Sequence, residues 1–246
     1  MATSRREFAK SSLALAGGFG LQGLLTTSDP ANIVCIGGHP DDPESGCGGT
    51  LARLSAAGHT ISILYLTRGE AGIAGTPPST AAEIRTREAV TACSILRANP
   101  YFLGQIDGET ILNNEWVARL LEQLDRLKPN LIFTHWPFDS HKDHQVASLL
   151  AMQAWTRMGR KIPLYFFEVC AGSQTMGFHP TDYVDITSTR EQKRKAVYCH
   201  ASQKPDEIYE APDCNHALME KFRGAEMNVE AAEAFVRLGK TGLPLG

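Results

Sequence analysis

The sequence predicts an α/β protein in three layers, with a mostly parallel sheet and helices on both of its faces. Two observations support this fold class. Short apolar runs of strand length alternate along the chain with longer segments that repeat apolar residues at helical spacing. That alternation is typical of right-handed βαβ units. The 246 residues are also enough for one sizeable domain with a hydrophobic core.

Six segments are predicted as strands, because each is a short run rich in branched or aromatic apolar residues. Buried strands of parallel sheets read as such continuous apolar runs. The predicted strands are Asn32–Gly37, Ile61–Leu66, Tyr101–Leu103, Leu131–Thr134, Pro163–Val169 and Tyr183–Ile186. Strands that alternate with helices in this way are typical of a Rossmann-like fold.

Six segments are predicted as helices from their apolar periodicity. They are Gly46–Gly58, Ala81–Arg97, Glu115–Leu127, His144–Met158, Glu191–Cys199 and Asn215–Leu238. The third of them ends before Pro129, as helices commonly do. The segment Thr67–Thr80 is rich in Gly, Pro and Thr, and it is long enough to be a functional loop.

Residues 1–31 are predicted to be an export signal and linker, followed by a single domain at 32–246. Arg5 and Arg6, with Phe8 and Lys10, precede a weakly apolar stretch, and this pattern is typical of the twin-arginine route. Four glycines between positions 17 and 23 disfavour the alternative, an ordinary amphipathic helix. We therefore expect a periplasmic or other extracytoplasmic location. The apolar run is short for a stable membrane span; a retained anchor is the alternative to cleavage.

The net charge narrows the class of partner, and the cysteine spacing narrows the kind of metal site. The formal net charge is −3 and there is no long basic run, so a nucleic-acid partner is not expected. A small-molecule or glycan substrate fits better.

None of the six cysteines forms a Cys-x-x-Cys pair, so a thiolate zinc site is not predicted. Cys35 and Cys170 lie in strand-like runs and are expected to be buried.

Imidazoles and carboxylates cluster in two segments about a hundred residues apart. His39–Glu44 reads His-Pro-Asp-Asp-Pro-Glu and follows the apolar run 33–36. His141–His144 reads His-Lys-Asp-His and comes shortly after the apolar run 131–133. Parallel sheets build their sites at the carboxyl ends of such strands. Two histidines and one carboxylate make a zinc site with an open position, so the two segments predict a hydrolytic zinc centre.

These segments resemble the PIG-L / LmbE-like family of zinc-dependent N-acetylglucosamine deacetylases. The resemblance covers nearly everything from Asn32 to Gln203. The motifs that carry it are His39-Pro-Asp-Asp-x-Glu44, Gly48-Gly49-Thr50-Leu51, Thr67-Arg68-Gly69-Glu70 and His141-x-Asp-His144. It implies that His39, Asp42 and His144 bind one Zn²⁺, which Fe²⁺ or another divalent metal could replace. It also implies that Asp41 is the general base, acting on a water whose pKa zinc lowers to about 7.

His141 lies three residues before His144, so it is expected to face the same cavity and to stabilise the oxyanion or protonate the leaving amine. Asp143 is expected to orient and charge-tune His141. The alternatives are a weak fourth ligand or a hydrogen-bonded loop histidine for His141, and an N-cap for Asp143. Some relatives carry a tyrosine two residues before this histidine, where the present chain has Asp139. Which group supplements His141 is therefore an open question.

Arg68 and Asp107 resemble substrate-binding residues of the family, and an exposed loop arginine is the alternative for Arg68. The resemblance implies removal of the acetyl group from an N-acetylated amino sugar or glycoconjugate. One alternative is hydrolysis of another amide, such as a thiol conjugate. A degenerate, exported glycan-binding protein is the other, but Asp41 argues against it, because a binding module needs no base.

Overall fold

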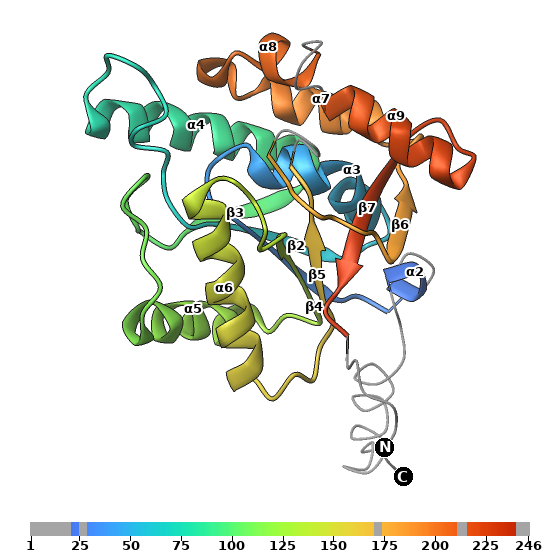
Figure 1. The fold of residues 1–246 in the computed structure, drawn as a ribbon, viewed down its shortest axis with the longest axis horizontal. Helices are drawn as coiled ribbons and strands as arrows, with labels where there is room; N and C mark the ends of the chain where they lie inside the picture. The colour runs from blue at the N-terminus through green and yellow to red at the C-terminus, as the bar shows by residue number, and fades with distance from the viewer. Residues whose placement is uncertain (1–20, 25–28, 170–173, 211–215, 240–246) are drawn as a thin grey trace, which may run out of the picture.

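The computed structural model describes residues 21–24, 29–169, 174–210 and 216–239, and it confirms the predicted α/β class (Figure 1). Within these residues the strands form one seven-stranded sheet in the order β3-β2-β1-β4-β5-β7-β6. The strands are β1 (Asn32–Gly37), β2 (Thr60–Tyr65), β3 (Ala98–Phe102), β4 (Leu131–His135), β5 (Leu164–Phe167), β6 (Asp182–Asp185) and β7 (Ala232–Arg237).

The strand order places a topological switch point at β1. β1 pairs in parallel with β2 on one side and with β4 on the other. β3 and β5 extend these two halves, again in parallel. The chain therefore builds the sheet outward from β1 in one direction and then in the other. The carboxyl ends of β1 and β4 adjoin, and α/β sheets hold their ligand sites at such a point.

Helices cover both faces of the sheet, as predicted. They are α2 (Leu21–Leu24), α3 (Asp42–Ala56), α4 (Pro78–Leu96), α5 (Asn114–Leu127), α6 (Lys142–Arg157), α7 (Arg190–Tyr198), η1 (Ala201–Gln203), α8 (Pro205–Tyr209) and α9 (His216–Met227). Figure 1 shows α3, α4 and α7 on one face and α5 and α6 on the other. Successive residues of β1 point to opposite faces, so Cys35 packs in the first core layer and Ile36 in the second.

The prediction of one long helix over Asn215–Leu238 is wrong. Helix α9 ends at Met227, Asn228 takes a left-handed conformation with φ of 59°, and the chain returns as strand β7. β7 runs antiparallel between β5 and β6. The alternation Ala-Glu-Ala-Phe-Val-Arg is compatible with either structure, and burial between two strands decides in favour of the strand.

Most of the expected leader lies outside the described residues, so export by the twin-arginine route stays a prediction. Leu21–Leu24 is described as the short helix α2, and the Leu21 side chain is buried in the core. No helix in the described part of the chain is long and apolar enough to cross a membrane. Cys35 is buried as expected, whereas Cys170 lies outside the described residues.

Helix α3 begins at Asp42, four residues earlier than predicted. Pro43 lies in its first turn, where the missing N–H costs nothing. The helix packs closely on the sheet layer through two glycines. A Cβ at Gly46 would lie 2.4 Å from the Phe167 ring, and a Cβ at Gly49 would lie 2.8 Å from Ile186. This close packing fixes the position of the turn that carries the two adjacent aspartates.

A buried ionic cluster also holds α3 in place. The Lys193 ammonium lies 2.9 Å from Glu220 Oε1 and 2.8 Å from Glu233 Oε1. The Glu233 carboxylate accepts hydrogen bonds from the backbone N–H groups of Gly49 at 2.9 Å and Thr50 at 2.7 Å. Lys193 is fully buried. The lysine therefore neutralises a carboxylate that is bonded directly to the backbone of α3.

We expect Lys193→Met to destabilise the fold by about 3–5 kcal/mol, because the buried Glu233 carboxylate loses its counterion and Glu220 is left with Arg190. Urea unfolding followed by circular dichroism measures the change. Lys195→Met is the matched control, since Lys195 is an exposed lysine on the same helix and should change the midpoint little. Equal midpoints for the two variants would contradict this account of the cluster.

Candidate metal centre and its cavity

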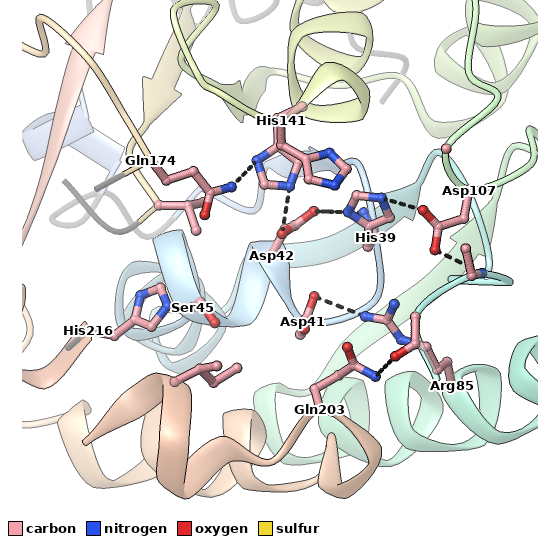
Figure 2. Close-up of a pocket in the computed structure, with 16 residues that line it drawn as sticks. His39, Asp41, Asp42, Ser45, Arg85, Asp107, His141, Gln174, Gln203 and His216 are labelled. Carbon is pink, nitrogen blue, oxygen red and sulfur yellow. Dashed lines mark hydrogen bonds and ion pairs between the residues drawn. The ribbon is translucent and has the colours of Figure 1, made fainter. Parts of the chain in front are cut away.

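A cavity of about 480 Å³ lies where β1 and β4 end. Six of the eight residues predicted for the site line it (Figure 2). They are His39, Asp41, Asp42, Asp107, His141 and His144. The fold has therefore brought side chains from three segments that are distant in the sequence into one cavity.

Asp42 joins the two predicted segments. Its Oδ2 lies 3.2 Å from His39 Nδ1 and accepts the backbone N–H of His39 at 2.7 Å. Its Oδ1 lies 3.1 Å from His144 Nε2. Burial would raise the pKa of Asp42, but the imidazoles of His144 and His135 outweigh it and hold that pKa well below its usual range. The carboxylate is therefore ionised, with a ring nitrogen beside each oxygen.

Carboxylates also hold the far nitrogen of each histidine. His39 Nε2 lies 3.0 Å from Asp143 Oδ2 and 3.1 Å from Asp107 Oδ1. His144 Nδ1 lies 3.2 Å from Asp139 Oδ2. Such partners fix the tautomer and orientation of metal-binding histidines. They leave His39 Nδ1 to face one oxygen of Asp42 and His144 Nε2 to face the other.

Asp143 does not orient His141 through its carboxylate, contrary to the prediction. Its carboxylate faces His39, and it accepts the Thr110 hydroxyl at 2.5 Å and the Gly108 N–H at 2.8 Å. Asp143 bonds to His141 through its backbone N–H, which donates to His141 Nδ1 at 3.3 Å. The reason is that α6 begins one residue after His141, which makes His141 the N-cap and turns Asp143 inward. The negative charge of Asp143 does act to raise the pKa of His141, as the predicted charge tuning requires, but burial and the neighbouring imidazoles outweigh it.

Three overlapping groups of described side chains could hold a metal ion. They are His39 with His141 and His144, Asp42 with His135 and His144, and His39 with Asp107 and Asp143. His135 is a poor ligand, because its Nε2 already accepts the Gly38 N–H at 3.0 Å. Burial and the neighbouring His144 lower the pKa of His135 to about 4, so it is a neutral, structural histidine.

Asp41 lies beside the ligands in a strained conformation. Its φ is 111°, which is rare outside glycine and costs about 1–3 kcal/mol. Its Oδ1 lies 3.3 Å from Arg85 Nη2, and 16% of its side chain is exposed. Burial and the neighbouring Asp42 raise the pKa of Asp41, and Arg85 opposes them only in part. A carboxylate with a raised pKa is a better proton acceptor, as a general base must be.

Arg68 does not reach the cavity, contrary to its predicted role. Its Nε donates to Thr86 Oγ1 at 2.9 Å and its Nη2 to the Ala82 carbonyl at 3.5 Å, both on α4. Asp107 does line the cavity, where it accepts the Ala71 N–H at 3.1 Å and faces His39. The loop after β2 therefore holds its arginine against a helix instead of against substrate.

Arg85 is the cavity arginine, and sequence reasoning missed it. It is 3% exposed, and its Nη2 donates to the Pro40 carbonyl at 2.5 Å. A Cβ at Gly72 would lie 2.3 Å from its guanidinium, so that glycine gives it room. One signal was present: Arg85 shares the face of α4 that buries Ala81 and Ala89. A charged residue on an apolar helix face is rare unless it is paired.

His141 lies at the entrance of the cavity, against both histidine ligands. Its ring centroid is 4.7 Å from that of His39 and 4.8 Å from that of His144. Burial and these two imidazoles lower the pKa of His141, which favours the neutral ring. Asp139, whose role the sequence left open, is buried behind His144 and does not line the cavity.

Comparison with known proteins gives a consistent result. A family model described as GlcNAc-PI de-N-acetylase (PIG-L) matches residues 34–155. The diacetylchitobiose deacetylase of Thermococcus kodakarensis is 29% identical over 74% of each chain. The 4-oxalmesaconate hydratase of Pseudomonas putida is 26% identical over 70% of this chain and 74% of that protein. The crystal structure of a conserved protein from Thermus thermophilus has a TM-score of 0.73 and 34% identity, covering 88% of this chain and 99% of that one. The chain therefore belongs to the PIG-L/LmbE-like deacetylase family.

Proposed function

We propose that the protein is a metal-dependent hydrolase that removes the acetyl group from an N-acetylated amino sugar. The position of Asp41 is the observation that carries the proposal. Its partly exposed carboxylate has a raised pKa and lies in the same cavity as His39, Asp42 and His144. A relative that deacetylates diacetylchitobiose supports the sugar substrate.

The three ligands suit a divalent metal such as zinc. Zinc binds imidazole nitrogen and carboxylate oxygen, and three protein ligands leave one position open. Asp42 is ionised, and the carboxylates behind His39 and His144 accept the protons that those rings keep when they bind metal. A bound divalent metal would polarise the amide carbonyl and make a water molecule more acidic.

The residues around the ligands would then carry the proton. Asp41 accepts a proton from the water that attacks the carbonyl carbon. As the C–N bond breaks, the nitrogen takes that proton and leaves as the amine, and the acyl group leaves as acetate. Arg85 holds the Asp41 carboxylate in place. Asp107, on the far side of His39, is available to a sugar hydroxyl.

Hydration of a carbon–carbon double bond is the second candidate, because one relative is a 4-oxalmesaconate hydratase. Both reactions need a base that takes a proton from water. They differ in product, since only the hydrolase breaks a C–N bond. The substrates also differ in charge, because a hydratase of this kind binds a polycarboxylate. The only cavity arginine among the described residues, Arg85, is already paired with Asp41, which favours the uncharged amide.

Acetate release is the direct test. The zinc-loaded protein should release acetate from at least one of N-acetylglucosamine, its short oligomers and N-acetylglucosaminyl conjugates, and a chelator should abolish the release reversibly. 4-Oxalmesaconate should be unchanged in the same assay. Turnover of 4-oxalmesaconate without acetate release from any amide would replace this proposal with the hydratase.

Two substitutions separate the roles of base and ligand. Asp41→Asn should lower kcat by about 10²–10⁴, the scale of a lost general base, and keep bound zinc. His144→Ala should instead lose zinc affinity. Zinc content by atomic emission, measured beside kcat, distinguishes the two, and Asp125→Asn on the exposed face of α5 is the matched control. An Asp41→Asn protein without zinc, beside a His144→Ala protein that keeps it, would reverse the assignment.

Zinc affinity should rise with pH. Burial lowers the pKa of His144, but the Asp42 and Asp139 carboxylates outweigh it and raise that pKa to about 9. The carboxylates around His39 likewise raise its pKa well above the usual value, against the effect of burial. Both rings are therefore protonated at neutral pH in the metal-free protein, and zinc must displace those protons.

Calorimetric zinc titrations at several pH values measure this competition. The affinity should increase by about tenfold per pH unit for each proton released, and the increase should become less steep above the His144 pKa of about 9. An affinity that is constant from neutral pH upward would mean that zinc binds to other groups.

A further inference from the structure

We propose that Gln174 is a catalytic residue, whose side-chain NH₂ donates a hydrogen bond to the carbonyl oxygen of the scissile amide as negative charge develops there. The inference rests on the proposed hydrolase function and adds a residue to it. Gln174 lines the cavity. Figure 2 shows it on the opposite side of Asp42 and His39 from Asp107.

The backbone of Gln174 is held against the loop that follows β4. The Ser140 N–H donates to the Gln174 carbonyl at 3.0 Å, and the Met176 N–H donates to the Phe138 carbonyl at 2.9 Å. Asp139 and Thr175 form an antiparallel bridge between these contacts. The short two-stranded unit therefore ties Gln174 to the segment that leads into His141. The side chain starts from a fixed position at the edge of the site.

The Gln174 amide lies next to Nδ1 of His144, the ring nitrogen that does not face Asp42. Its Nε2 lies 3.0 Å from His144 Nδ1, and Asp139 Oδ2 lies 3.2 Å from the same nitrogen. When His144 binds a metal through Nε2, its one remaining proton lies on Nδ1. The ring then presents an N–H to this side, so an amide NH₂ at 3.0 Å would place two donors face to face.

A half-turn of the amide about its terminal bond resolves that conflict. It exchanges the amide oxygen and nitrogen without moving any other atom. The oxygen then accepts from His144 Nδ1 together with Asp139, and the NH₂ group faces the cavity. In the metal-loaded protein, the Gln174 NH₂ group therefore has two N–H donors. It faces the cavity next to His144.

The Arg85 and Gln203 donors of the cavity wall, and Asp139 behind His144, are already used. The Arg85 guanidinium is bonded to the Pro40 carbonyl and paired with Asp41. The Gln203 amide donates to the Gly72 carbonyl at 3.1 Å. Asp139 faces His144 and, as a carboxylate, has no proton to donate. Gln174 and His141 both adjoin the His144 ring, where each would stabilise an oxyanion.

Gln174→Leu and Gln174→Glu test the role together. Loss of one oxyanion donor lowers kcat by about 10²–10³, and KM should change far less, because the bond strengthens in the transition state. Gln174→Glu keeps an acceptor for the His144 N–H but turns an anionic oxygen toward the cavity, so kcat should fall at least as far. Its zinc affinity, measured by competition with a chelator, should not fall.

Gln192→Leu is the matched control. The Gln192 amide is also half-buried and makes one hydrogen bond to a backbone carbonyl, but far from the site. Parent-like kcat in both Gln174 variants would overturn the inference. So would weaker zinc binding with kcat restored at saturating zinc, because Gln174 would then only position His144. A parent protein that releases no acetate would instead overturn the proposed hydrolase, and the inference with it.

Discussion

The Asp42 carboxylate, with one oxygen beside His39 and the other beside His144, is the interaction on which the site depends. It is available only because β1 and β4 are neighbours in parallel register, with Ile36 opposite Thr134. Both strands therefore end at the same edge of the sheet. Helix α3 begins at Asp42 itself, so the start of a rigid element, and not a free loop, sets the position of the carboxylate.

Several costly features surround that carboxylate, and the rest of the fold compensates for them. Asp41 has a left-handed backbone conformation, and Arg85 and Asp143 are charged groups with almost no exposed surface. The compensation comes from specific partners. Asp143 is bonded to Thr110, Gly108 and His39. The Lys193 cluster anchors the middle of α3. The geometry of the site is thus maintained by buried charges that are individually paired, as burial of charge requires.

Much of this arrangement could be predicted from the sequence, because strand ends and their polar residues are local signals. Apolar runs indicated β1 and β4, and the polar residues directly after them gave His39, Asp42 and His144. The direction in which a side chain points cannot be predicted from the residues next to it in the sequence. Asp143 turns to His39 because α6 starts at Lys142, and Arg68 turns to α4 because Thr86 and Ala82 accept its hydrogen bonds.

The remaining differences come from tertiary contacts, which the sequence signals only weakly. Arg85 reaches the cavity from the middle of a helix, through space left by Gly72. Gln174 comes from the segment after β5, which is placed by pairing with residues 138–140. The sequence of β7 also fits the end of a helix, because only its partners β5 and β6 distinguish the two structures.

The central claim is that one metal ion is held by His39, Asp42 and His144, with Asp41 free beside it. A crystal structure of the zinc-loaded protein, with anomalous diffraction measured at the zinc absorption edge, tests it most directly. The account predicts one strong peak bonded to His39 Nδ1, Asp42 and His144 Nε2, with Asp143 still on His39 Nε2. A peak between His39 Nε2, Asp107 and Asp143, or bonds from Asp41 to the metal, would contradict it.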